Sequence, residues 1–321
     1  MARAAGLTAP AQPSPSAAAR GWTLGLLGVL AFSLTLPMTR LAVSQIDPGV
    51  VAFGRMAIAG LLAAGWLAIE RTRRRPGAGD LRLVAASALG IVLGFPLLST
   101  LALRATAANH AAIITGALPL ATALFGRLLY RERHAAGFWL AALAGSALVI
   151  AFALSRGHGG LVAGDLWMLG AVAAGAFGYA TGARLAQRVG GVRSILWALA
   201  AATPLTVPVA LVLTLRAPPH ADAAAWGAFA YVTVVSQLLG FFAWYNGLAL
   251  GGIARVGQVQ LLQVFFTIAF AAYAFGEAVP PSTWWFAAAV AATLAWGRRA
   301  DRVATEPPSP HPAATDRGEA R

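Results

Sequence analysis

Polar side chains inside long apolar stretches are the residues of this chain that can do chemistry. Gln260, Gln263 and Thr267 follow one another at i, i+3 and i+4 spacing, which places them on one face of a helix. Gln263 lies about ten residues into its stretch, so roughly 15 Å deep at a rise of 1.5 Å per residue. Gln237 lies at a similar depth in the preceding stretch. The pattern predicts a hydrogen-bonding wall for a polar substrate, with amide bonds between helices as the alternative.

Arg55 lies about a third of the way into an earlier apolar stretch, and two hypotheses account for it. Its guanidinium can attract an anionic substrate or a carboxylate. It can also extend toward the membrane surface, or donate to the carbonyls of a neighbouring helix. Because a buried unpaired arginine is costly in lipid, we favour a structural role with permanent partners and keep substrate binding as the second hypothesis.

Two glutamates, Glu132 and Glu277, each close a long apolar stretch. Glu132 stands beside Arg131, Arg133 and His134, so we expect local ion pairing that fixes a helix end. Glu277 has no arginine in its own connection, and we assign it a candidate role in gating or coupling, with simple helix termination as the alternative.

Signs of catalysis are missing from the sequence. The chain has no cysteine, which excludes disulfides and thiolate chemistry. It has no phosphate-binding loop of the Walker type, so transport driven by ATP on this chain alone is not expected. No histidine pairs with a serine and an aspartate at a recognisable spacing; the five are His110, His134, His158, His220 and His311. We therefore expect no enzyme, no cofactor and no metal site.

The composition is that of a membrane protein. Of 321 residues, 59% are hydrophobic and 11% are charged, whereas soluble domains carry about 25% charge. Mean hydropathy is +0.70. Many apolar runs approach the roughly 20 residues that span a bilayer. We predict ten spans, at 22–43, 48–69, 83–103, 108–130, 136–155, 164–185, 192–215, 226–249, 253–276 and 281–298.

The net charge of +13 reflects orientation rather than nucleic acid binding. All 24 basic residues are arginine, and most lie beside apolar segments. With the N-terminus inside, 19 arginines fall in inner connections and termini. Only four fall outside, namely Arg40, Arg104, Arg156 and Arg216. The positive-inside rule then predicts both termini in the cytoplasm. The all-arginine usage and the richness in alanine and glycine suggest a high-GC bacterium, and we expect the chain in its inner membrane. Residues 1–21 and 299–321 are predicted to be disordered cytosolic tails.

The ten spans form two copies of one unit. Rare residue types recur at a fixed offset of 145 residues, as in Trp22 and Trp167, Phe32 and Phe177, Thr122 and Thr267, Trp139 and Trp284, and Glu132 and Glu277. The copies cover 22–155 and 164–298. Five spans is an odd number, so the second copy is inverted in the membrane. Inverted repeats are a recurring design of secondary transporters, in which two halves exchange conformations around a shared cavity.

The two ends of the repeat unit resemble a known family. One segment runs from Asn109 through Pro119 to Arg131-Glu132, and its partner runs from Tyr245-Asn246-Gly247 through Gln263 to Gly276-Glu277. Over residues 22–298 the chain resembles EamA-type transporters of the drug/metabolite transporter superfamily. The resemblance implies ten helices in two five-helix repeats, with an arginine in helix two at the place of Arg55.

The sequence departs from that family pattern at three places. At the offset of 145 residues, Pro119 corresponds to Val264 rather than to a second proline. Arg55 corresponds to Ala200, so the second copy lacks that arginine. The first and sixth spans lack the acidic residue that proton-driven small relatives use. We group Asn109 with the candidate substrate-binding residues, and Pro119 with Glu132 and Glu277 as candidates for gating or coupling.

The sequence thus predicts an all-α membrane protein that exports a small polar metabolite, such as an amino acid, by alternating access. The export direction and the substrate class rest on the resemblance alone. A flippase for a lipid or lipid-linked carrier is the first alternative, and a non-transporting sensor or assembly factor is the second. The expected partners are a small-molecule substrate and the lipid bilayer, with a homodimer left open and nucleic acid excluded.

Overall fold

The computed structural model describes residues 15–70, 75–105, 111, 114–154, 163–275 and 281–303, and within these ranges it contains helices and no strand. Six helical stretches are long and apolar enough to cross a bilayer: Ser16–Val43, Pro48–Glu70, Ala78–Ala105, Gly164–Val189, Gly191–Arg216 and Ala223–Gly251. Shorter apolar helices cover Leu118–Tyr130, Ala136–Leu148 and Trp284–Gly297. The chain is therefore an all-helical, multi-pass membrane protein, as predicted.

The elements fall on either side of residues 155–162. The first group comprises α1 (Pro15–Ser33), α2 (Thr35–Val43), α3 (Pro48–Glu70), α4 (Ala78–Ser87), the π-helix η1 (Ala88–Gly94), α5 (Phe95–Ala105), α7 (Leu118–Tyr130) and α8 (Ala136–Leu154). The second comprises α9 (Ala163–Val189), α10 (Gly191–Arg216), α11 (Ala223–Ala230), the π-helix η2 (Tyr231–Leu239), α12 (Gly240–Gly251), α13 (Ile253–Gly257), the 3-10 helix η3 (Gln258–Leu262), α14 (Gln263–Phe275) and α15 (Pro281–Val303).

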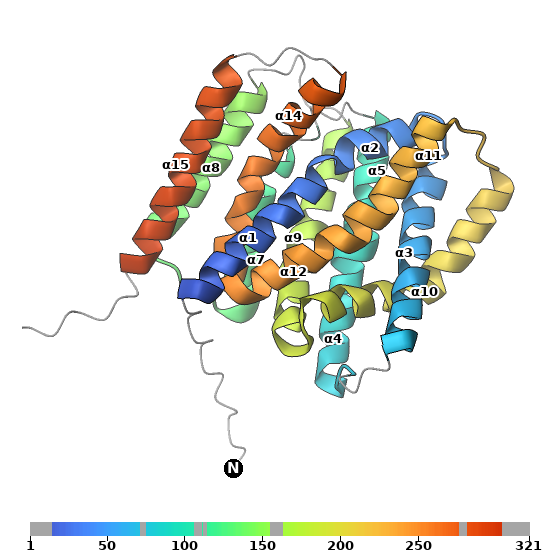
Figure 1. Ribbon diagram of the computed structural model, residues 1–321, viewed down its shortest axis with the longest axis horizontal. Helices are drawn as coiled ribbons and strands as arrows, with labels where there is room; N and C mark the ends of the chain where they lie inside the picture. Colours follow the sequence, from blue (N-terminus) through green and yellow to red (C-terminus); the bar gives the residue numbers. More distant parts are fainter. Residues whose placement is uncertain are drawn as a thin grey trace, which may run out of the picture.

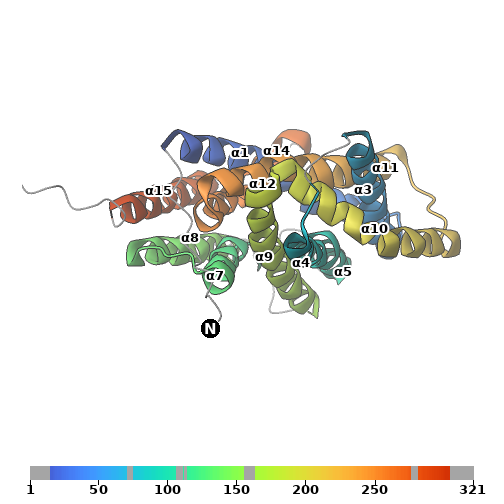
Figure 2. The ribbon, with the colours of Figure 1, turned by 90° about the horizontal axis from the view of Figure 1, so that it is seen from below.

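Helices from the two groups pack against each other in pairs. α3 lies along α10 at one edge of the bundle, and α8 lies along α15 at the other (Figure 1). Between these edges α1 lies along α12, and α9 packs against α4, η1 and α5 (Figure 2). Each pair joins one element from residues 15–154 to one from residues 163–303, so the core belongs to both groups together.

Glycines allow two of these pairs to approach backbone to backbone. A Cβ atom added to Gly21 of α1 would lie 2.7 Å from the nitrogen of Gly251 in α12. A Cβ on Gly178 of α9 would lie 2.6 Å from the nitrogen of Ile91 in η1. Small residues spaced four apart permit such contacts between membrane helices, whose stability rests on close packing rather than on hydrophobicity.

Prolines coincide with irregular backbone near the middle of the bundle. Pro37 has no N–H to donate to the carbonyl of Ser33, and the regular helix is interrupted at Leu34, between α1 and α2. Pro96 lies two residues after the end of the π-helical turns of η1. In contrast, Pro204 and Pro208 lie within the continuous helix α10. The regular α-helical hydrogen bonding is therefore disturbed near Pro37 and Pro96 and continues through Pro204 and Pro208.

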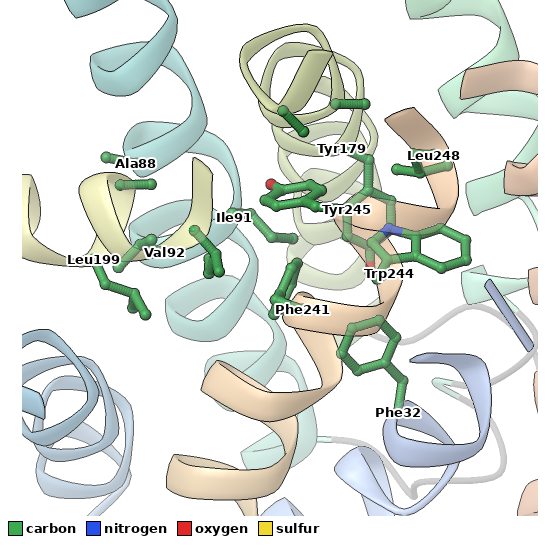
Figure 3. Close-up of a cluster of buried hydrophobic side chains, with 14 of the residues drawn as sticks. Phe32, Ala88, Ile91, Val92, Tyr179, Leu199, Phe241, Trp244, Tyr245 and Leu248 are labelled. Carbon is green, nitrogen blue, oxygen red and sulfur yellow. The ribbon is translucent and has the colours of Figure 1, made fainter. Parts of the chain in front are cut away.

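An aromatic cluster of Phe32, Tyr179, Phe241, Trp244 and Tyr245 fills the centre around α12 (Figure 3). The Phe241 ring lies 4.9 Å from that of Phe32 and 5.3 Å from that of Tyr245, and the Tyr179 ring lies 5.3 Å from that of Trp244. Trp244 and Tyr245 are both 0% exposed. Both residues therefore belong to the packed core.

Candidate functional site

A narrow cavity lies between the two groups of helices, in which the centre of a water-sized sphere can occupy about 30 Å³; all the empty space around it, including the part open to the outside, amounts to about 620 Å³. α1, α2, α3, η1, α5 and α7 border it from the first group, and α9, η2, α12, η3 and α14 from the second. Its polar lining residues are Thr35, Arg55, Thr115, Tyr179, Ser236, Gln237, Gln260 and Gln263. Four of the predicted substrate-binding residues, far apart in sequence, therefore share one cavity.

Irregular backbone positions Gln263 and Gln260. The 3-10 turn of η3 ends at Leu262, and Gln263 begins α14. The Gln263 Nε2 donates to the Phe32 carbonyl at 3.3 Å, next to the break between α1 and α2. The Gln260 Nε2 donates to the Tyr179 hydroxyl at 3.2 Å. Gln260 and Gln263 thus fit both hypotheses: each donates a hydrogen bond to another helix, and each lines the cavity wall.

Arg55 is buried at 2% exposure on the cavity face of α3. Its Nη2 lies 3.4 Å from the Ser236 hydroxyl, which in turn lies 2.8 Å from the Thr35 hydroxyl. Its Nε and Nη1 have no hydrogen-bond partner among the described residues. We expected permanent partners for this arginine, and the described structure provides one long hydrogen bond to a neutral hydroxyl.

Two cavity amides also keep one unsatisfied atom each among the described residues. The Gln237 Nε2, a donor, and the Gln260 Oε1, an acceptor, are buried without a partner. Buried polar atoms are normally hydrogen-bonded, and each exception calls for an explanation. Here the unsatisfied atoms belong to side chains that line one cavity, so a ligand in that cavity can supply their partners.

The rest of the cavity wall is apolar and largely aromatic. Phe32, Phe95, Phe241 and the ring of Tyr179 line it, together with Ile91. Trp244 and Tyr245 lie one helical turn beyond Phe241 in the direction of Gly251 and back this wall. A ligand that fits this cavity therefore combines polar groups with an apolar part.

Thr267 and Pro119 are described and fall outside the cavity lining. Thr267 donates to the Ser33 carbonyl, the group that Pro37 leaves without its helical partner. The carbonyl of Pro119 accepts a hydrogen bond from Gln258 Nε2 at 3.3 Å. Asn109 and Glu277 lie outside the described residues.

Glu132 lies away from the cavity, after the end of α7. Its Oε2 is 3.4 Å from His134 Nε2, in agreement with the expected local ion pairing. The same oxygen accepts a hydrogen bond from the Ala254 N–H in α13 at 3.3 Å. This second contact, which ties the end of α7 to the start of α13, does not follow from the spacing of charges around Glu132.

Polar contacts at both ends of the bundle join the two groups of helices. Arg188 of α9 pairs with Asp80 of α4 at 2.7 Å, and Arg193 of α10 pairs with Glu70 of α3 at 2.6 Å.

At the opposite ends of these helices, Gln45 Nε2 donates to the Asp222 carboxylate at 2.9 Å. That bond, with the backbone N–H of Ala225, holds the pKa of Asp222 below its ordinary value.

Sequence reasoning missed Ser236, Thr35 and Tyr179 as lining residues. Ser236 directly precedes Gln237, and a polar pair inside an apolar stretch was a usable signal. Thr35 enters the lining beside the helix break that Pro37 imposes two residues later. Among the described residues no group of three or more His, Cys, Asp and Glu side chains is arranged to hold a metal ion.

Comparison with known proteins places the chain among transporters. It matches the EamA-like transporter family over residues 19–154 and again over 162–296. It is 46% identical over 259 residues to the uncharacterized transporter YdeK of Bacillus subtilis, covering 81% of this chain and 90% of that protein. It is 24% identical over 252 residues to an uncharacterized transporter of Archaeoglobus fulgidus, covering 74% and 83%.

A solved crystal structure of a protein with 18% sequence identity superposes with a TM-score of 0.71, over 90% of this chain and 99% of the other. At that identity the likeness concerns the fold alone. The two matched ranges and the identity to YdeK go further: the chain belongs to the EamA-like transporter family, within the drug/metabolite transporter superfamily, and is a membrane transporter.

Proposed function

We propose that this protein is a secondary transporter of the bacterial inner membrane that exports a small polar metabolite by alternating access. The substrate would bind in the cavity between the two groups of helices, which we take to be two inverted repeats of five helices each. One observation carries the proposal: Arg55, Gln237, Gln260 and Gln263 line a single cavity although they come from three separate parts of the chain, α3, η2 and the continuous stretch of η3 and α14.

The arrangement of the bundle supports a mechanism of this kind. The cavity is bordered by elements from both groups, so a small rotation of one group against the other changes its access. The polar contacts at the two ends, Arg188–Asp80 and Gln45–Asp222, each join one group to the other. Breaking one set while the other holds would open the cavity to one side at a time.

The arginine distribution of the sequence supports an orientation with both termini in the cytoplasm. In that orientation the Arg188–Asp80 and Arg193–Glu70 pairs belong to the cytoplasmic side, and the Gln45–Asp222 contact belongs to the outer side. Glu277 stays a candidate for coupling on the grounds of the sequence alone.

Transport by purified protein in proteoliposomes tests the proposal. Uptake and exchange of radiolabelled amino acids, N-acetylated amino acids, nucleosides and sugars would be compared for the wild type and the Gln237→Leu and Gln263→Leu variants. Leucine keeps the side-chain volume near that of glutamine and removes both amide atoms. Gln187→Leu is the matched control, because Gln187 is exposed near the end of α9.

We expect at least one substrate class to be transported, with both cavity variants impaired and the control unaffected. If both cavity variants transported like the wild type, the site assignment would be wrong. If no soluble compound moved but a fluorescent lipid analogue crossed the membrane faster than in protein-free vesicles, the flippase alternative would replace the metabolite proposal.

A further inference from the structure

The cavity holds an unbalanced positive charge. Arg55 is the charged side chain among the described residues that line it, and no aspartate or glutamate belongs to that lining. Among the residues that the structure describes, the guanidinium has no partner for the N–H donors on Nε and Nη1, and its one hydrogen bond goes to the neutral Ser236 hydroxyl. A buried cation without an anion is costly, and its neutralisation by a ligand is correspondingly favourable.

The unsatisfied amide atoms indicate which hydrogen-bonding groups a ligand of this site carries. Within the described part of the chain, Gln237 Nε2 is a further donor without a partner. Gln260 Oε1 is there an acceptor without one, and the amide nitrogen of Gln260 already donates to Tyr179. The free donors therefore match the oxygens of an acidic group. The free acceptor matches a hydroxyl or an amide N–H.

We propose that the cavity selects monoanions: small carboxylates with a net charge of −1, an apolar or aromatic body, and a neutral hydrogen-bond donor. The carboxylate binds the Arg55 guanidinium and the Gln237 amide, the donor binds Gln260 Oε1, and the body contacts Phe32 and Phe241. N-acylated amino acids and apolar hydroxy acids have this chemistry. The inference rests on the proposed central binding site and names the class of substrate that it takes.

Charge arithmetic separates this class from free amino acids. A monoanion neutralises the cavity, whereas a zwitterion brings an ammonium group for which the lining offers only neutral acceptors, and the net charge stays at +1. A cation doubles the charge. A dianion leaves one carboxylate desolvated and without a cation. The expected order of affinity is monoanion first, then zwitterion and dianion, and cation last.

Ligands built on one benzyl scaffold test this order. N-acetyl-L-phenylalanine, L-phenylalanine, 2-phenylethylamine and benzylsuccinate carry net charges of −1, 0, +1 and −2 near neutral pH. Each would be titrated against the full-length protein in detergent while its melting temperature is followed, since a ligand that binds the folded state raises that temperature. N-acetyl-L-phenylalanine is expected to give the largest rise and 2-phenylethylamine none.

Variants of Arg55 locate the effect. Arg55→Gln should weaken N-acetyl-L-phenylalanine binding by about tenfold or more, which corresponds to about 1.4 kcal/mol, and should abolish the preference over phenylalanine. Arg55→Lys retains the charge and should retain the preference, so it replaces Arg55→Gln if that variant fails to fold. Arg216→Gln removes an exposed arginine at the end of α10 and should behave like the wild type.

The outcomes separate this inference from the proposed function. If the monoanion gives no larger shift than the zwitterion or the cation, or if Arg55→Gln binds it unchanged, the inference is overturned, although transport of another compound would leave the transporter proposal standing. If the monoanion binds through Arg55 but does not cross the membrane in proteoliposomes, the inference on binding holds and the transport proposal fails.

Discussion

Three pairs of residues 145 positions apart meet in the cavity, and two of them have opposite chemistry. Ile91 and Ser236 both line it, as do Leu118 and Gln263, and in these two pairs the first group of helices provides the apolar member and the second the polar one. In the third pair, Thr115 and Gln260, both members are polar. Under the proposed repeat these are equivalent positions, and the side chains at two of the three pairs differ in polarity.

The charged lining residue has the opposite distribution, because it comes from the first group of helices. Arg55, from the first group, lines the cavity, whereas its equivalent Ala200 does not. The first group thus contributes the cation and most of the apolar wall, and the second contributes the amides Gln237, Gln260 and Gln263. Neither group carries a complete site, which is the physical reason to expect binding only when both are packed together.

The largest loss of stability is expected at the glycine contacts, to which both groups of helices contribute. Gly178→Ala would place a Cβ atom 2.6 Å from the Ile91 nitrogen, and Gly247→Ala one 2.7 Å from the Gly25 nitrogen. Each should destabilise the protein by about 1–3 kcal/mol or more, because the helix backbones must separate. Melting temperature and monodispersity on size exclusion measure this.

Gly65→Ala is the matched control, since nothing lies within 4 Å of a Cβ at Gly65, and alanine favours helix over glycine. Equal melting temperatures for Gly65→Ala and Gly178→Ala would refute the close contact.

A smaller effect is expected when the diverged positions are made alike. Leu118→Gln copies Gln263 onto the apolar side of the cavity, where Leu118 is 4% exposed. An unsatisfied buried amide costs roughly 1–3 kcal/mol, so the variant should melt at a lower temperature than the wild type. Melting curves with and without N-acetyl-L-phenylalanine measure this. A variant as stable as the wild type would mean that the cavity accepts an amide on either side, and the asymmetry would not matter.

The smallest effect is expected at the charged end of the bundle. Arg188→Gln removes the pair with Asp80, in which the arginine side chain is 48% exposed. Exposed ion pairs contribute about 0–1 kcal/mol, so the melting temperature should change little, and added salt should reduce the change further. Melting curves at low and high salt check this. A loss as large as that of Gly178→Ala would show that this contact, rather than backbone packing, holds the two groups together.

Much of this picture follows from the sequence, because membrane helices carry strong local signals. Uninterrupted apolar runs indicate the spans, and the depth of Gln237 and Gln263 within them indicates cavity residues. The all-helical fold and the family were predicted correctly. The cost of burying Arg55 was also weighed, but the sequence cannot show which partners a neighbouring stretch supplies.

The features that the sequence could not show depend on irregular backbone and on contacts between residues distant in sequence. The expected continuous helix over 253–276 contains the 3-10 segment Gln258–Leu262, so spacing alone could not show that Gln260 bonds to Tyr179 while Thr267 bonds to Ser33. The burial of Trp244 and Tyr245 arises from packing with helices distant in sequence, which no local pattern shows.

The most direct test of a shared alternating cavity uses the absence of native cysteine from this chain. Val264→Cys places a single thiol in the cavity lining, and Leu205→Cys places one on the outer surface of α10, where Leu205 is 54% exposed. Membrane-impermeant thiol reagents would be applied from each side of oriented vesicles, with and without N-acetyl-L-phenylalanine. The account predicts that Val264→Cys reacts from both sides and is protected by the ligand, whereas Leu205→Cys reacts from neither. Reaction of Val264→Cys from one side only, under all conditions, would contradict it.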